Sequence, residues 1–412
     1  MKQIFTILAV AATLAGFAAC TKVDVDQTAA RGHKISFEVA SYLTQTKATN
    51  VPGSGTSLWG ELTSPSFITN AYFYPETGDA NQHYMNNVTI SPYKSDGTTA
   101  ATSEATTAIW QPAVEYFWPK TGYINFFSYA ATKALTVSFA DVASSETKTI
   151  TIASAADPVT IAADDNFLLA DACYNAKESN AGEDKNNMTG PSEVTPMGVP
   201  TLFRHLLCQV QFKARLYSEK KHANTKYEVA ILSASINDGD ATPVDSRLVN
   251  NGYLTATSGA KEGSTLEIQN WGTSGVQKWS EATTPAYEGV VAMTATTDNL
   301  VLPVQATAAA HNSATTHQLL DLRTFRPQAI AAASTFTITY TVTAYHGTVK
   351  YSEETITVSK ALKDFTPNSG VWRCNDKVTY LISIDPVTST ITFDPAVAEW
   401  TEPNGALTIP LS

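Results

Sequence analysis

The stretch STFTITYTVTAYHGTVKYSEETITVSK, residues 334–360, decides the fold class. Its first half alternates Thr with apolar residues. The apolar phase consists of Phe336, Ile338, Tyr340, Val342 and Ala344. Such alternation is the period of a β-strand with one buried face. His346-Gly347 suits a tight hairpin turn, so the stretch predicts two long antiparallel strands.

Similar short β-signals recur along the chain between turn-like segments, whereas helical periodicity is weak. They include NVTISPY, YINFFSYA, LCQVQFKARLY, YEVAILSASIND and KVTYLISIDP. Many short strands separated by Gly, Pro and Asn predict an all-β sandwich architecture. With 412 residues the chain exceeds one ordinary sandwich, so we expect two domains, 48–245 and 246–412.

The overall charge excludes one class of partner. The formal net charge is −11 and charged residues make up only 16% of the chain. Nucleic-acid binding needs a basic footprint to neutralise phosphates, so no nucleic-acid partner is expected. Apolar residues make up 43%, enough for a sizeable core.

Motifs for catalysis or cofactor binding are missing. The sequence contains no GxGxxG after a strand, no GxxxxGK[ST], no HExxH and no GxSxG. His311 and His317 lie six residues apart in a loop-like stretch, which is a weak metal-site pattern. We therefore predict no enzymatic activity, no cofactor and no metal site.

Several residues have a structural and a functional interpretation. His205, in FRHLLCQV, is expected to be packed or to cap a strand start. The Trp and Tyr residues lie mostly in strand phase and favour core packing over a sugar-binding platform. Cys173, Cys208 and Cys374 show no zinc spacing, and either one disulfide or three buried thiols fits them.

The N-terminus has the pattern of a signal peptide. A short basic segment precedes the apolar run 4–19, which is too short for a comfortable membrane span. It ends in GFAAC, and this resembles a bacterial lipobox, although Phe17 stands where Leu, Val or Ile is usual. The resemblance implies cleavage after residue 19 and acylation of Cys20; ordinary signal cleavage with an incidental cysteine is the alternative. Without Asp beside Cys20, the resemblance to bacterial lipoproteins favours the outer membrane.

A predicted core strand lies close behind this leader. Ile35, Phe37 and Val39 share one phase of an alternating run, which is typical of a half-buried strand. Arg31-Gly32 precedes it and Lys47-Ala48 follows it, and both are trypsin-like cleavage sites. A protease could therefore detach a strand that belongs to the core.

Several segments, in order, resemble motifs of the Bacteroidetes fimbrillin superfamily, the subunits of type V pili. They are EYFWPKTGYINFFSYA (115–130), VPTLFRHLLCQVQFKARL (199–216), NLVLPVQ (299–305), GVWRCNDKVTYLISID (370–385) and ITFDPAVAEW (391–400). Cys374-Asn375 departs from the usual Pro-Gly-like turn, and the polar insertion 175–196 is long.

The resemblance implies two tandem transthyretin-like β-sandwich domains behind a lipidated propeptide, residues 20–47. A trypsin-like surface protease would cut between Lys47 and Ala48 and release the strand of Ile35, Phe37 and Val39. A cut at Arg31-Gly32 would leave that strand attached and is the less useful one. A strand from another subunit would then fill the groove by β-strand addition.

The C-terminus offers a candidate donor strand in residues 406–412. Leu407, Ile409 and Leu411 have period two, with Pro410 in the opposite phase. The alternative is that this segment is simply the last strand of the C-terminal domain.

The implied function is that of a structural fimbrial subunit that supports adhesion. Its expected partners are other fimbrial subunits, the outer membrane through lipid on Cys20, and the protease, with host or bacterial surface ligands as further candidates. Its location would be the outer membrane and then the extracellular fimbrium. The alternative function is a non-polymerising surface lipoprotein that binds glycans.

Overall fold

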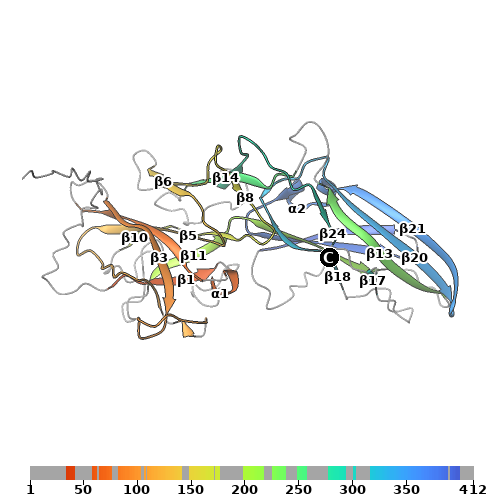
Figure 1. The fold of residues 1–412 in the computed structure, drawn as a ribbon, viewed down its shortest axis with the longest axis horizontal. Coiled ribbons are helices and arrows are strands. Elements are labelled where there is room, and N and C mark those ends of the chain that lie inside the picture. The colour runs from red at the N-terminus through yellow and green to blue at the C-terminus, as the bar shows by residue number, and fades with distance from the viewer. Residues whose placement is uncertain are drawn as a thin grey trace, which may run out of the picture.

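A computed structural model gives the fold of the chain. It describes residues 34–41, 58–62, 65–76, 82–103, 106–107, 109–141, 148–170, 172–176, 198–217, 225–237, 248–257, 277–293, 300–302, 316–387 and 390–399. These residues are almost entirely β-structure, which confirms the predicted fold class. None of the helices among them is long or apolar enough to cross a membrane. The described part is elongated, with red and orange strands at one end and blue strands at the other (Figure 1).

The strands of the first half are short and closely spaced in sequence. They are β1 (Phe37–Ser41), β2 (Phe67–Tyr74), β3 (Gln82–Tyr93), β4 (Ile109–Pro112), β5 (Tyr123–Ala131), β6 (Val137–Asp141), β7 (Lys148–Ile152), β8 (Val159–Thr160), β9 (Phe167–Ala170), β10 (Cys173–Ala176) and β11 (Val199–His205). One short helix, α1 (Leu58–Glu61), lies between β1 and β2.

The second half contains the longest strands. They are β12 (Cys208–Leu216), β13 (Thr225–Asn237), β14 (Asn251–Thr257), β15 (Gln277–Ser280), β16 (Val290–Ala292), β17 (Leu300–Leu302), β18 (His317–Phe325), β19 (Gln328–Ala329), β20 (Thr335–His346), β21 (Val349–Ala361), β22 (Val371–Trp372), β23 (Asp376–Asp385) and β24 (Thr390–Glu399). A 3-10 turn (Leu362–Phe365) and a short helix, α2 (Pro367–Gly370), follow β21.

The N-terminal strands form a sheet that closes on itself. Their order is β10-β5-β2-β3-β4-β1-β11-β9, and β9 pairs again with β5. Seven of these strands therefore make a ring in which β1 lies between β4 and β11. The ring encloses an apolar core built on aromatic side chains, among them Phe67, Phe126 and Phe203, each at most 2% exposed.

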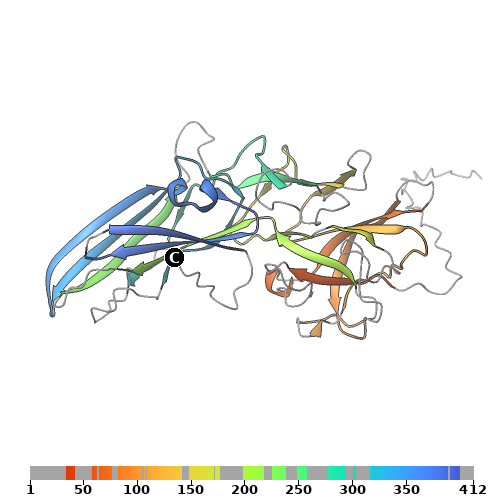
Figure 2. The ribbon, with the colours of Figure 1, turned by 180° about the vertical axis from the view of Figure 1, so that it is seen from behind.

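The C-terminal strands form two sheets around a second core. One sheet has the order β18-β12-β23-β24 and the other the order β16-β13-β20-β21, with β17 on β13. Phe212 of the first sheet stacks on Phe336 of the second, with ring centroids 4.6 Å apart. This is the sandwich arrangement that the sequence predicts, and Figure 2 shows it from behind.

The hairpin of residues 334–360 is confirmed. β20 and β21 pair antiparallel from Thr335↔Ala361 to His346↔Val349. The apolar phase of β20 is buried, and Gly347 takes a positive φ of 62° in the turn. The turn falls one residue later than predicted, because His346 still pairs and Thr348 does not.

Strand pairing divides the chain earlier than the predicted boundary near 245. β12 and β13, which precede residue 245, pair with strands between 317 and 399, and their side chains belong to the C-terminal core. The change from one group of sheets to the other falls between His205 and Cys208. The two-domain division itself remains a prediction.

A third, smaller sheet and core lie at the junction of the two groups. β14, β15, β7 and β6 pair there, and β8 joins β14. Trp279 of β15 donates its indole N–H to the Leu206 carbonyl at 2.8 Å, directly after β11. Asn375 donates its backbone N–H to the Leu207 carbonyl at 3.0 Å. These bonds connect the end of β11 to elements far away in sequence.

Candidate functional site

The candidate site is the place of β1 within the N-terminal ring. β1 pairs parallel with β11 over five residues, from Phe37↔Val199 to Ser41↔Phe203. On its other side Phe37 pairs with Trp110 of β4, and Lys34 bridges to Phe117. Ile35 N–H donates to the Tyr116 carbonyl at 2.8 Å. β1 is therefore bonded along both edges, although β11 holds far more of it than β4 does.

The predicted buried phase of this strand is confirmed. Ile35 is 2% exposed and Phe37 is 3% exposed. Val39 is half-buried and packs against the same core. Burying such side chains stabilises the fold by about 1.5–3 kcal/mol each. Loss of β1 would expose the apolar surface that these side chains cover.

Phe37 occupies an aromatic box. Its ring meets Phe67 edge to face at a centroid distance of 5.4 Å and 80°. It meets Phe126 in the same way at 5.7 Å and 88°. Phe203 of β11 supports Phe67 at 5.3 Å, and Trp118 supports Phe126 at 5.9 Å. The box is therefore held from several strands at once.

The beginning of β1 is fixed by contacts that are partly exposed. Lys34 forms an ion pair with Glu115, but both side chains are more than half exposed, so the pair contributes little. Tyr84 of β3 donates its hydroxyl to the Phe117 carbonyl at 2.6 Å. Burial raises the pKa of this hydroxyl, which stays protonated and keeps the Phe117 segment beside Lys34.

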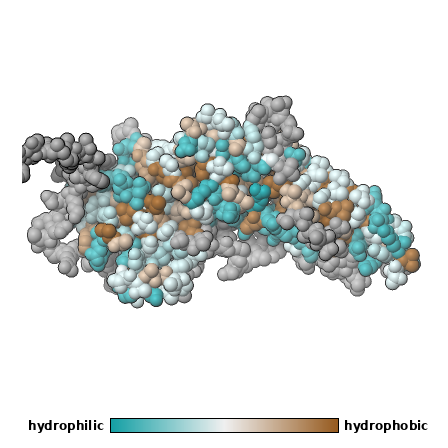
Figure 3. Space-filling model, in the orientation of Figure 1, coloured by the Kyte–Doolittle hydropathy of each residue, from teal (hydrophilic) through white to brown (hydrophobic). Residues whose placement is uncertain are grey.

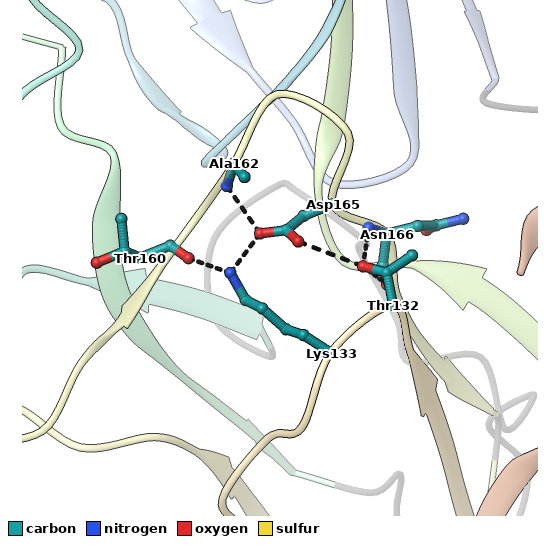
Figure 4. Close-up of polar contacts among 6 residues, drawn as sticks. All are labelled: Thr132, Lys133, Thr160, Ala162, Asp165 and Asn166. Atoms are coloured by element: carbon teal, nitrogen blue, oxygen red, sulfur yellow. Dashed lines mark hydrogen bonds and ion pairs between the residues drawn. The ribbon is translucent and has the colours of Figure 1, made fainter. Parts of the chain in front are cut away.

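The other six strands of the ring stay paired with one another without β1. Figure 4 shows the contacts where the end of β5 meets the start of β9. Asp165 accepts hydrogen bonds from Ala162 N–H at 2.7 Å and from the Thr132 hydroxyl at 3.3 Å, and it pairs with Lys133. Asn166 N–H donates to the Thr132 hydroxyl at 3.0 Å. This partly buried network holds β5 and β9 together independently of β1.

The neighbours of β1 each keep a second partner. β4 also pairs with β3, and β11 also pairs with β9. Removal of β1 would thus leave one row of unpaired backbone groups on each side of an apolar groove. Unpaired strand edges are templates for another strand. The arrangement can therefore accept an extended segment that restores both ladders.

Most predicted processing residues lie outside the described residues. These are Cys20, Arg31, Gly32, Lys47, Ala48, Leu407, Ile409 and Leu411. Lipid attachment at Cys20, cleavage at Lys47-Ala48 or Arg31-Gly32, and donation by residues 406–412 accordingly stay predictions.

The other candidate residues have structural roles. His205 is 2% exposed, and its Nδ1 lies 2.8 Å from the Asn166 side-chain oxygen, so the prediction of a packed histidine is confirmed. Cys173, Cys208 and Cys374 are free and buried. Within the described ranges no group of three His, Cys, Asp or Glu side chains could hold a metal ion. Of the described Phe, Trp and Tyr side chains, only Tyr351 is exposed.

Sequence reasoning did not identify the residues that line the groove. Trp110, Phe67 and Phe126 come from three strands that are distant from β1 in the chain. Each of them reads as an ordinary core residue in its own strand. The parallel partner β11 lies within the motif at 199–216, but local alternation carries no information about which strand pairs with which.

Comparisons with known proteins give structural neighbours only. No family model matches the chain, and no curated protein matches it. A fimbrial protein from Bacteroides vulgatus shares 14% identity, covers 89% of this chain and 99% of its own, and has a TM-score of 0.41. The tip fimbrial protein Mfa3 from Porphyromonas gingivalis, with a C-terminal truncation, shares 9% identity over 84% of this chain and 97% of its own, with a TM-score of 0.32.

Both of these neighbours are fimbrial proteins. Their TM-scores and identities are too low to carry an argument about this chain's function. The functional conclusion therefore rests on the geometry of β1 and its groove.

Proposed function

We propose that this protein is a structural subunit of a bacterial surface fimbrium that supports adhesion. In this proposal it is exported as an outer-membrane lipoprotein with its lipid on Cys20, and it has no enzymatic activity. A trypsin-like surface protease cuts between Lys47 and Ala48. β1 then leaves, and a strand of another fimbrial subunit takes its place.

One observation carries the proposal: β1 occupies an interior position in the ring, between β4 and β11, and buries its apolar phase in the core. β1 supplies two deeply buried side chains, Ile35 and Phe37, and pairs with β11 over five residues. β1 is the first strand of the described residues, and a trypsin-like site at Lys47 follows it in the sequence.

The energetics of the exchange follow from this position. While β1 is part of the chain, its effective concentration at the groove is on the order of millimolar or more, so a free strand at micromolar concentration cannot compete. After cleavage that advantage is lost. An empty groove leaves the surface under Ile35, Phe37 and Val39 in water, at about 1.5–3 kcal/mol for each fully buried side chain. Filling it with a partner strand drives assembly.

The candidate donor segment gives the subunit a second role. Residues 406–412 carry Leu407, Ile409 and Leu411 in strand phase, and they can be offered to the groove of a neighbouring subunit. A subunit with both a groove and a donor strand can join two neighbours. Assembly thus requires no covalent link between subunits.

The test uses fimbriae sheared from cells that express the protein with its native partners. The wild-type chain should enter SDS-resistant ladders and carry a new N-terminus at Ala48. Lys47→Ala should remain a full-length, membrane-bound monomer. Arg31→Ala, the matched control, should assemble normally because it leaves the cut after β1 intact. If Lys47→Ala enters ladders as well as the wild type does, cleavage at this site is not the trigger.

A further inference from the structure

We propose that the groove left by β1 selects a segment from a different protein chain, one with an aromatic side chain at the position of Phe37 and a branched aliphatic one two residues earlier. Residues 406–412 of a second copy of this chain are a poor donor for it. The inference rests on the proposed strand exchange and specifies the partner that exchange requires.

The positions of β1 in the groove differ in burial and in the side chains that surround them. Ile35 and Phe37 are almost fully buried, whereas Val39 keeps part of its surface exposed. The binding contribution is therefore concentrated in the first two positions. Of these, the Phe37 position has the more specific surroundings, because two aromatic rings meet it edge to face.

The aromatic box cannot adapt easily to a smaller side chain. Phe67, one wall of the box, is itself in contact with Trp110 at 5.9 Å and with Phe203 at 5.3 Å. Phe126, the other wall, is held by Trp118 at 5.9 Å. Rings fixed from behind cannot move inward to fill a void, and a site that cannot collapse loses most on truncation. Leu or Ile would also forfeit both edge-to-face contacts.

Residues 406–412 lack the required side chain. In residues 406–412 the apolar phase contains only Leu and Ile, with no aromatic residue. Any register that keeps this phase toward the core places Leu407, Ile409 or Leu411 in the aromatic box. Each would leave part of the box empty.

Pro410 provides a second, independent obstacle. Val199 N–H donates to the Ser36 carbonyl at 2.6 Å, so the backbone groups of Ser36 and Glu38 are directed toward β11 in the parallel ladder. Pro410 has the same phase as these residues in every register that buries Ile409. It has no N–H to give to β11, and proline is suited to sheet edges rather than to a position paired on both sides.

The experiment measures which peptides enter the groove. The full chain is folded, cut with trypsin, and loaded with a fluorescent peptide of residues 33–41, HKISFEVAS. Unlabelled competitors are the same peptide, its Phe37→Leu form, its Val39→Ala form as the matched control, and a peptide of residues 404–412. Fluorescence anisotropy gives the concentration at which each displaces the label.

Two edge-to-face aromatic contacts contribute about 0.5–1.5 kcal/mol each, so the Phe37→Leu peptide should compete roughly tenfold to a hundredfold more weakly. The peptide of residues 404–412 should be weaker still, and Val39→Ala should lose less than Phe37→Leu. If Phe37→Leu and 404–412 compete as well as the parent peptide, the selectivity is refuted while strand exchange stands. If not even the parent peptide enters the cut protein, both are refuted.

Discussion

Truncation of Phe37 should open the groove without any cleavage. Phe37 is 3% exposed and touches two aromatic rings, so Phe37→Ala removes a fully buried side chain from a box that cannot collapse. Substitutions of this kind cost about 3–5 kcal/mol. In the proposed exchange β1 detaches while the other six strands of the ring stay paired, so most of this cost should appear as detachment of β1.

The expected loss of stability in Phe37→Ala is large enough to measure. A loss of about 3 kcal/mol raises the population with β1 detached roughly a hundredfold. The assay is uptake of the fluorescent peptide of residues 33–41 by uncut protein. The wild type should take up almost none because its own β1 is tethered at the groove. Phe37→Ala should bind the peptide without protease treatment.

Phe336→Ala is the matched control. Phe336 is also a fully buried phenylalanine with aromatic neighbours, but it belongs to β20 in the other group of sheets. It should lower the denaturation midpoint by a comparable amount and leave peptide uptake at the wild-type level. The reasoning is refuted if uncut Phe37→Ala binds no more peptide than Phe336→Ala, or if Phe37→Ala leaves stability unchanged.

Two further predictions concern the framework of the fold. Gly122→Ala should destabilise the protein by more than about 1–3 kcal/mol, because φ at Gly122 is +76° and an added Cβ would lie 2.4 Å from the Tyr74 carbonyl oxygen. Gly347 also has a positive φ, but a Cβ added there meets nothing within 4 Å, so Gly347→Ala should cost only the backbone strain. Urea denaturation of the two variants compares the two costs. Burial raises the pKa of Cys173 to about 12 and also raises that of Cys374, while an unfolded thiol ionises near about 8.5. As the pH rises, the unfolded chain therefore loses these thiol protons before the folded chain does. The free energy of unfolding keeps its full value below about pH 8.5 and falls as the pH rises toward 12. Cys173→Ala should make this fall, measured as the urea midpoint, shallower.

With β1 in place, the side chains of Ile35 and Phe37 are almost fully covered. The face drawn in Figure 3 mixes hydrophilic and neutral residues with small, separate apolar groups. Val349 and Tyr351, at 66% and 56% exposure, lie near the tip of the β20–β21 hairpin and form only a minor patch. In the proposed exchange, the apolar surface under β1 becomes accessible when that strand leaves.

The fold class and the buried phase of β1 could be predicted because both depend on local alternation. Ile35 and Phe37 face the core for the same reason that Phe336 and Ile338 do: every second side chain of a strand points to one face. His205 was likewise predictable as a packed residue because Leu206 and Leu207 follow it, although it ends β11 and does not start a strand as predicted.

Strand partners could not be predicted, because pairing in this fold joins distant segments. Nothing in residues 35–41 indicates that β11, more than a hundred residues later, is the parallel neighbour. For the same reason the sequence could not show that β12 and β13 join the C-terminal sheets: local alternation does not identify a partner strand, and only their register with β18, β20 and β23 shows where they pair.

The most direct test of the central claim is the composition of the assembled polymer. Fimbriae are purified in SDS, dissociated by boiling, and digested for quantitative mass spectrometry, with a peptide of β20 as the internal standard for the subunit. The account predicts that residues 34–41 are absent from the polymer although they are present in the unassembled precursor. Recovery of residues 34–41 in a one-to-one ratio with the β20 peptide would contradict it.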